Sequence, residues 1–180
     1  MRVLVAYASR HGATAGIAAR IAERLSDSGH AVDLVPADEV ESVGGYDAVV
    51  LGAAAYIAHW MKDATAFARH HRTELAERPT WLFSSGPLGT ERVDAEGRDV
   101  LEAARPKEFD NLEARLHPRA VKVFFGAWDP SNPPVGFAER AMARLPKAAA
   151  ALPAGDFRNW DAVDSWADTI ATELFQAPTD

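Results

Sequence analysis

The chain has 180 residues, of which 48% are hydrophobic and 25% charged, a composition that predicts one soluble globular domain over residues 1–180. No stretch approaches the roughly 18 uninterrupted apolar residues that a membrane span needs. The absence of cysteine excludes disulfides, iron–sulfur clusters and thiol catalysis, so redox chemistry would depend on a bound cofactor or metal. The net charge of −7 argues against nucleic acid as the main partner.

The sequence begins directly with a strand-like run, Met1–Tyr7. It lacks the longer apolar segment and the small-residue cleavage site of a secretory signal, so we expect a cytoplasmic protein. Peripheral contact with a membrane surface stays open.

Short apolar runs alternate with amphipathic segments along the chain, which predicts an α/β fold with helices on both faces of a parallel sheet. Continuous runs at residues 3–6 and 49–51 are typical of strands that are buried on both faces. Five strands are predicted in all, at Val3–Ala8, Ala31–Val35, Ala48–Gly52, Thr80–Phe83 and Val121–Phe125.

Apolar residues at three- and four-residue spacings predict helices between these strands, and Ile17, Ile21 and Leu25 form one such apolar stripe. The helices run from Thr14 to a stop at Gly29, from about Lys62 to Ala76, and from Asp161 to Phe175. Five strands with helical crossovers match the doubly wound fold with strand order 2-1-3-4-5, in which ligands bind beyond the carboxyl ends of the strands.

Two segments rich in glycine and proline interrupt this regularity. One runs from Gly86 to about Pro106 after the fourth strand, and the other from Trp128 to Pro134 after the fifth. Long loops in compact domains are often functional lids, and the alternative is a flexible surface excursion.

The turn Ser9-Arg10-His11-Gly12-Ala13-Thr14 joins the first strand to the first helix. A phosphate there can accept backbone N–H bonds, aided by the helix dipole and the two hydroxyls, while Gly12 allows close approach. The turn lacks the Gly-Lys-Ser/Thr ending of a P-loop and the three spaced glycines of a dinucleotide fingerprint. The alternative is an ordinary helix start capped by Ser9 or Thr14.

Two further segments follow the third and fourth strands. Ala53-Ala54-Ala55 would let a planar ring approach the backbone, and Tyr56 can stack on that ring. The alternative is that Tyr56 and Trp60 pack on the sheet edge. In Ser85-Gly86-Pro87-Leu88-Gly89, backbone groups can bond the edge of the same ring, and the alternative is a tight turn.

The pattern strand-Ser9-x-His-Gly-x-Thr14-helix resembles the FMN-phosphate loop of flavodoxins, with His11 where a hydroxyl residue is common. Along nearly its full length the chain resembles the flavodoxin-domain proteins that include menaquinone-dependent protoporphyrinogen oxidase. That resemblance is carried by Ser9-x-His-Gly-x-Thr14, Gly52-Ala-x-x-Tyr56-x-x-His59, Phe124-Phe-Gly-Ala127 and Asp161-x-x-x-x-Trp166. It implies that FMN is the cofactor, held by Ser9–Thr14, Ala53–Tyr56 and Ser85–Gly89.

The resemblance implies an FMN-dependent oxidoreductase that passes electrons between the flavin and a quinone-like or porphyrinogen-like partner. Tyr56 and His59 are the candidates to steer substrate over the ring, and no general base is expected. The oxidase carries a basic, aromatic insertion after the fifth strand, whereas residues 128–153 here hold three cations, Arg140, Arg144 and Lys147. The alternatives are an electron carrier that docks to redox proteins and a scaffold that has lost FMN.

Other chemistries have weaker support in the sequence. His59, His70 and His71 do not form a metal set, because adjacent histidines point to different faces of a helix. A Gly-x-Ser-x-Gly elbow for hydrolase chemistry is also lacking.

Overall fold

The computed structural model describes residues 1–132 and 153–176. In this part of the chain, five parallel strands form the main sheet in the order β2-β1-β3-β5-β6. They are β1 (Arg2–Ala8), β2 (Ala31–Pro36), β3 (Ala48–Tyr56), β5 (Thr80–Ser85) and β6 (Ala120–Phe124). The predicted α/β class and strand order are confirmed.

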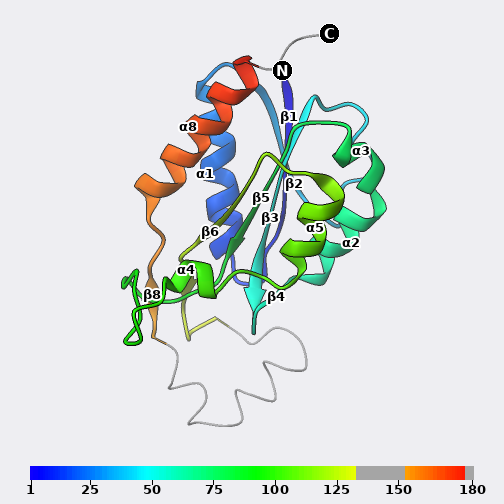
Figure 1. Ribbon diagram of the computed structural model, residues 1–180. Coiled ribbons are helices and arrows are strands. Elements are labelled where there is room, and N and C mark those ends of the chain that lie inside the picture. Colours follow the sequence, from blue (N-terminus) through cyan, green and yellow to red (C-terminus); the bar gives the residue numbers. More distant parts are fainter. Residues whose placement is uncertain (133–152, 177–180) are drawn as a thin grey trace.

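Helices cover both faces of the sheet (Figure 1). One face carries α1 (Ala13–Asp27) and α8 (Trp160–Gln176), and the other carries α2 (Lys62–His70), α3 (Arg72–Ala76) and α5 (Glu108–Leu116). Within the residues described, no helix is both long and apolar enough to cross a membrane.

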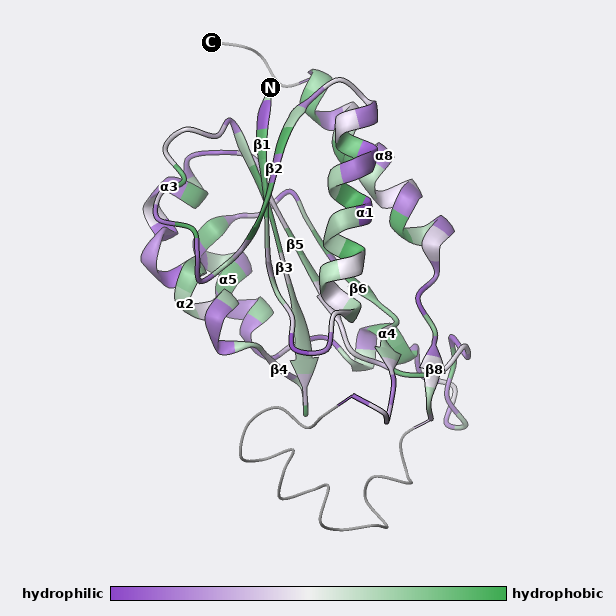
Figure 2. Cartoon of the chain, turned by 180° about the vertical axis from the view of Figure 1, so that it is seen from behind, coloured by the Kyte–Doolittle hydropathy of each residue, from purple (hydrophilic) through white to green (hydrophobic). Residues whose placement is uncertain are grey.

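The continuous apolar strands are explained by two cores, one on each side of the sheet. Val3 and Val5 of β1 face α1 and α8, while Leu4 and Ala6 face α2, α3 and α5. Hydropathy colouring shows apolar residues along the strands and polar residues on the outer surfaces of the helices (Figure 2). Burial on both faces removes the polar alternation that an exposed sheet would show.

Ion pairs tie α8 to α1. Arg20 forms a bidentate pair with Asp164, with both N···O distances at 2.7 Å, and Arg24 contacts Asp168 four residues further along. Pairs with this much solvent contact contribute about 0–1 kcal/mol each, so their main effect is to fix the register between the two helices.

The structure differs from the sequence prediction at several elements. The helix predicted over Lys62–Ala76 divides at His71, whose φ of −97° and ψ of 19° leave the helical region. The predicted end of the third strand at Gly52 is wrong, because β3 continues to Tyr56 and pairs with the short antiparallel strand β4 (His59–Trp60). In this extension Ala53 and Ala54 are buried, Ala55 is half-buried and Tyr56 is exposed.

Other elements were not predicted. Helix α5 precedes β6, and a single turn, α4 (Val100–Ala103), lies within the segment from Gly86 to Pro106. The antiparallel pair β7 (Ala127–Trp128) and β8 (Gly155–Asp156) follows the fifth parallel strand. Pro133 and Pro134 lie outside the described residues.

His30 is a buried titratable group between α1 and β2. Its side chain is 6% exposed and lies 4.7 Å from the Phe175 ring, measured between centroids. Among the described residues, neither ring nitrogen makes a hydrogen bond of normal geometry. Burial lowers the pKa of His30, and the backbone of Ala171 only partly opposes this. The neutral ring is therefore the form that the fold prefers.

His30 predicts a loss of stability in mild acid. Because its pKa is lower in the folded than in the unfolded state, the unfolded chain binds the proton first and stability falls as pH drops below about 6.5. We expect the melting temperature of the wild type to fall more between about pH 7.5 and about pH 5.5 than that of His30→Leu. The exposed His70→Gln serves as the control, and equal pH dependence of wild type and His30→Leu would contradict this assignment.

Candidate functional site

The three segments singled out in the sequence meet at one edge of the sheet. The carboxyl ends of the central strands are in register there, with Ala8 beside Ala53, Ala54 beside Ser85, and Ser85 beside Phe124. Parallel strands place the loops that follow them on the same side, which is where doubly wound sheets bind ligands.

The loop after β1 leaves the first turn of α1 open. Gly12 occupies the N-cap position with a φ of +83°, a left-handed conformation that favours glycine. Within the described residues, no side chain caps α1, and its first turn contains no acid. Ser9 does not cap the helix, because its hydroxyl oxygen accepts a bond from the Gly12 N–H at 3.1 Å. The partial positive charge of the helix start is therefore available to an anion.

Thr14, in the same first turn, points into the protein. Its side chain is 1% exposed, and its hydroxyl lies 2.8 Å from the hydroxyl of Ser85, which is 2% exposed. Either oxygen can be the donor. This bond connects the first loop to the end of β5.

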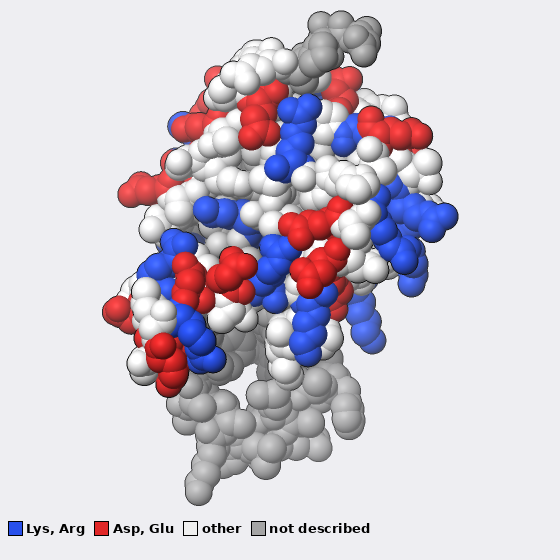
Figure 3. Space-filling view, in the orientation of Figure 1, with Lys and Arg blue, Asp and Glu red and all other residues white. Residues whose placement is uncertain are grey.

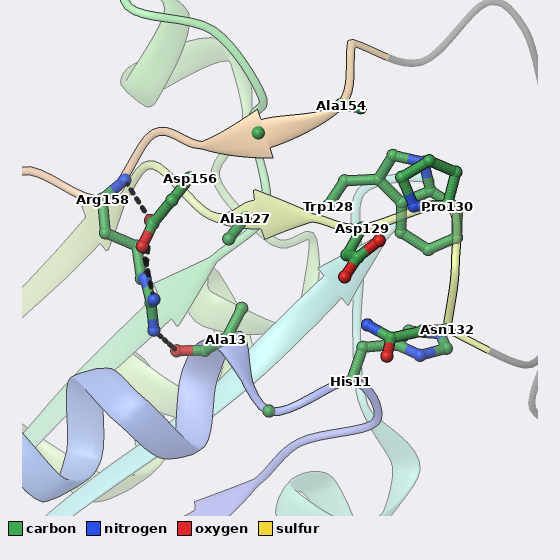
Figure 4. A pocket seen from close by; sticks show the side chains of 12 residues that line it. His11, Ala13, Ala127, Trp128, Asp129, Pro130, Asn132, Ala154, Asp156 and Arg158 are labelled. Atoms are coloured by element: carbon green, nitrogen blue, oxygen red, sulfur yellow. Dashed lines mark hydrogen bonds and ion pairs between the residues drawn. The ribbon is translucent and has the colours of Figure 1, made fainter.

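A cavity of about 670 Å³ opens beside the start of α1. His11, Gly12 and Ala13 form one wall, and residues of the β7–β8 pair and its flanks form the other (Figure 4). The His11 and Trp128 rings meet edge to face, with centroids 5.4 Å apart. Trp128 Nε1 is buried and has no hydrogen-bond partner among the residues of known placement. The cavity thus combines an apolar aromatic wall with the open helix start.

Charges at this cavity partly cancel. Arg158 holds Asp156 through several hydrogen bonds, including one of 2.7 Å from Nε, and also donates to the Ala13 carbonyl at 3.3 Å. The bond from Arg158 lowers the pKa of Asp156, so this carboxylate stays paired. On the same wall, hydrogen bonds from Ser131 lower the pKa of Asp129. Arg158 therefore links the segment before α8 to the first residue of α1.

The β3–β4 hairpin stands at the edge of the site with an unusual turn. Ile57 and Ala58 have φ angles of +52° and +59°, and Ile57 is 90% exposed. A β-branched residue rarely adopts this conformation, and such strain persists only where its surroundings hold it. Tyr56, 37% exposed, lies under the Arg10 guanidinium, 4.7 Å from the ring centroid. The β3–β4 hairpin therefore contacts the loop after β1.

Glu108, at the start of α5, holds this hairpin. One carboxylate oxygen accepts the Trp60 N–H at 2.9 Å, and the other lies 2.8 Å from His59 Nδ1. The neighbouring residue also holds the hairpin, because the Lys107 N–H donates to the Ala58 carbonyl at 3.0 Å. Burial raises the pKa of Glu108, but the bonds from Trp60 and His59 outweigh it and lower the pKa overall.

Strand β3 contributes small residues beside the site. A Cβ at Gly52 would lie 1.9 Å from the Phe83 ring, so only glycine fits beside that side chain. Trp60 is 3% exposed, and its indole N–H donates to the Ala53 carbonyl at 3.1 Å. Trp60 therefore packs in the core at the sheet edge, in line with the packing alternative, whereas Tyr56 stays half exposed.

The loop after β5 is only partly buried at residues 86–89. The Gly126 N–H donates to the Pro87 carbonyl at 2.9 Å, which ties this loop to the end of β6. All three predicted segments thus lie at the carboxyl end of the sheet, but only the first of them, through His11, Gly12 and Ala13, lines the cavity. Their contact with a cofactor stays a prediction.

Sequence reasoning missed Glu108 and Arg158. Both act across the fold, on partners 48 and 145 residues away. No local motif marked either position. Over residues 1–132 and 153–176, no cluster of three His, Cys, Asp or Glu side chains is placed to hold a metal ion.

Removal of the Glu108 carboxylate should loosen the hairpin. Glu108→Ala leaves the Trp60 N–H without its acceptor, so we expect the free energy of unfolding to fall by about 1–3 kcal/mol in urea titration. The matched control is Asp110→Ala, since Asp110 lies on the same helix and its side chain is 88% exposed. This control should change the free energy of unfolding by less than about 0.5 kcal/mol. Because the folded pKa of Glu108 is lowered, its contribution is present above about pH 4.5 and is lost at lower pH. Equal effects of the two variants would contradict the role of Glu108.

Solved structures share this fold at low sequence identity. A flavodoxin from the domain Archaea has a TM-score of 0.58 at 13% identity, covering 97% of this chain and 99% of that one. Rubredoxin oxygen:oxidoreductase from Desulfovibrio gigas has a TM-score of 0.61 at 14% identity, and the match covers 97% of this chain and 36% of that protein. The flavodiiron core of Flv1 from Synechocystis has a TM-score of 0.63 at 13% identity, and the match covers 99% of this chain and 37% of that protein. The chain thus spans little more than a third of the last two proteins.

No curated protein matches the chain in sequence. Residues 4–151 match the family described as Flavodoxin domain. The matched range includes the open start of α1 and the loops after β3 and β5. Since this match covers most of the chain, the protein belongs to the flavodoxin domain family.

Proposed function

We propose that the protein binds FMN at the edge of the sheet formed by the loops after β1, β3 and β5, and uses it for electron transfer. The observation that carries this proposal is the start of α1, left without a side-chain cap or an acid and preceded by Gly12 in a left-handed conformation. Such a helix start supplies N–H groups and a positive dipole end to a phosphate. The family match adds support, since flavodoxin domains bind flavin.

Each predicted segment has a role in this proposal. Backbone N–H groups of Ser9–Thr14 would hold the phosphate, with His11 able to donate through a ring nitrogen. The flavin ring would lie between Ala53–Tyr56 and Ser85–Gly89, where Tyr56 is 37% exposed and residues 86–89 are partly buried, while Ala53, Ala54 and Ser85 are buried. The Gly86–Gly89 backbone would bond the ring edge and tune its potential.

The flavin, when bound, accepts and releases electrons either singly or as hydride. The protein's residues would position it at the edge of the sheet. Tyr56 and His59 stand on the hairpin beside the ring site, and Glu108 orients the His59 ring through Nδ1. We propose that these two side chains steer a quinone-like or porphyrinogen-like substrate, with no general base.

The second candidate function is an electron carrier for protein partners. It is favoured by the high coverage of the archaeal flavodoxin, whose full length this chain matches. Acidic and basic side chains are interspersed on the face shown in Figure 3, so that face has no single-sign docking surface. Mixed charge on that face gives a protein partner less long-range steering there than a uniform patch would.

Titration with FMN tests the proposal. We expect the flavin fluorescence to be quenched and its visible band to shift as the protein is added. Absence of any spectral change at saturating protein concentration would refute FMN binding.

Substitution of Tyr56 tests its place beside the ring. We expect Tyr56→Ala to weaken binding of both FMN and riboflavin by roughly two- to tenfold, because an aromatic contact contributes about 0.5–1.5 kcal/mol. Tyr56→Phe keeps the ring and should bind as the wild type does. Weakening confined to FMN would place Tyr56 near the phosphate instead.

Stopped-flow reoxidation of the reduced protein separates the two functions. An enzyme with a quinone-like substrate should be reoxidised rapidly by menadione, with saturation as menadione is raised. Rapid reoxidation by a carrier-protein acceptor alone would favour the carrier.

A further inference from the structure

We propose that Arg158 is a positioning residue for the phosphate site, because it holds the first turn of α1 at a fixed distance from the β7–β8 pair. Gly16 supplies the space that the guanidinium of Arg158 occupies. The inference rests on the proposed FMN site and deepens it, since it assigns the geometry of that turn to a residue near the other end of the described chain.

Arg158 spans the two walls of the cavity. It follows β8, which belongs to one wall, and its Nη1 donates to the carbonyl of Ala13, the first residue of α1, at 3.3 Å (Figure 4). A carbonyl oxygen has two lone pairs, so Ala13 can accept this bond in addition to a helical one. One side chain therefore joins the start of α1 to the opposite side of the cavity.

The guanidinium of Arg158 is held at several points. Its Nε and Nη2 donate to the two carboxylate oxygens of Asp156 at 2.7 and 2.5 Å, and its carbon lies 4.5 Å from the centroid of the Trp160 ring. The preceding backbone is also fixed, because the Phe157 N–H donates to the Gly126 carbonyl at 3.0 Å. Two parallel bonds to one carboxylate set the orientation of the guanidinium plane. The first turn of α1 is thus tied to a fixed point.

Gly16 allows this close approach. A Cβ at this position would lie 2.4 Å from Nη1 of Arg158 and 3.8 Å from the Trp160 ring. Because Nη1 is the far end of a flexible side chain, an added methyl group would displace the guanidinium and leave the helix in place. Glycine inside a helix is less favourable than alanine, so replacement of Gly16 separates this contact from helix stability.

The contribution of Arg158 is one of geometry, because Asp156 balances its charge. Hydrogen bonds from Arg158 lower the pKa of Asp156, so this carboxylate is ionised at neutral pH. A close pair of opposite charges attracts a further anion only weakly. Hydrogen-bond strength falls steeply with misalignment, so a small tilt of the first turn would weaken its N–H contacts to a phosphate.

Comparison of FMN with riboflavin tests the inference, since riboflavin lacks the phosphate. In fluorescence titrations of the full chain, we expect Arg158→Met and Gly16→Ala each to weaken FMN binding roughly three- to tenfold relative to riboflavin. Arg158→Lys should show the same loss, because an ammonium group cannot hold Asp156 by two parallel bonds and also reach Ala13. The matched control is Arg20→Met, which removes the pair between α1 and Asp164 and should keep the wild-type ratio.

Stability and amide exchange separate positioning from general damage. Gly16→Ala should melt no lower than the wild type, because alanine favours the helix, and yet lose its preference for FMN. In the cofactor-free protein, the Gly16 N–H bonds to the Gly12 carbonyl at 2.9 Å. We expect this amide to exchange roughly three- to tenfold faster in Arg158→Met than in Arg20→Met. If Arg158→Met does not fold, the FMN-to-riboflavin ratio of Gly16→Ala still decides.

Several results would overturn the inference. A wild-type ratio in Arg158→Lys, or a weaker salt dependence of FMN binding in Arg158→Met, would mean that Arg158 acts on the phosphate through its charge. Equal weakening of FMN and riboflavin, or an unchanged ratio in Gly16→Ala, would mean that the contact has no selective role. If the wild type binds neither flavin, the proposed function itself fails, while the exchange rate at Gly16 still decides whether Arg158 fixes the turn.

Discussion

The site depends on the open helix start of α1 at the carboxyl edge of a parallel sheet. Parallel strands buried on both faces force their connecting loops to one end, and α1 begins there without a cap. An unsatisfied helix start is tolerated where water or a ligand supplies the acceptors. The same edge carries the half-buried loop after β5 and the small residues of β3, so one constraint assembles groups from three distant parts of the sequence.

Contacts between the loops, rather than any loop alone, give the site its shape. Arg10 lies over Tyr56, Thr14 pairs with Ser85, and Arg158 reaches the Ala13 carbonyl. Glu108 and the Lys107 N–H hold the hairpin in a turn that its sequence, Ile57-Ala58, disfavours. Left-handed strain of this kind costs on the order of 1–3 kcal/mol per residue and persists only where the surrounding contacts hold it.

Much of the fold could be predicted because its signals are local. Continuous apolar runs marked the parallel strands, and the four-residue spacing of Ile17, Ile21 and Leu25 marked α1, all three of which are buried. The extension of β3 to Tyr56 could not be predicted, since it depends on pairing with β4 and on Trp60 reaching the Ala53 carbonyl. The roles of Glu108 and Arg158 likewise depend on contacts over long sequence separations, which no spacing pattern reveals. Their partners become neighbours only after the sheet has assembled.

The bond from Arg158 to the Ala13 carbonyl couples the two ends of the described chain. The Arg158 contact with the first turn of α1 forms only when the segment before α8 lies against that turn, and α8 is itself aligned by the Arg20–Asp164 and Arg24–Asp168 pairs. The loop proposed to hold the phosphate, although encoded near the start of the sequence, therefore takes its final geometry from residues near the end of the described chain. A ligand that binds only this folded arrangement would stabilise molecules in which the last helix has docked.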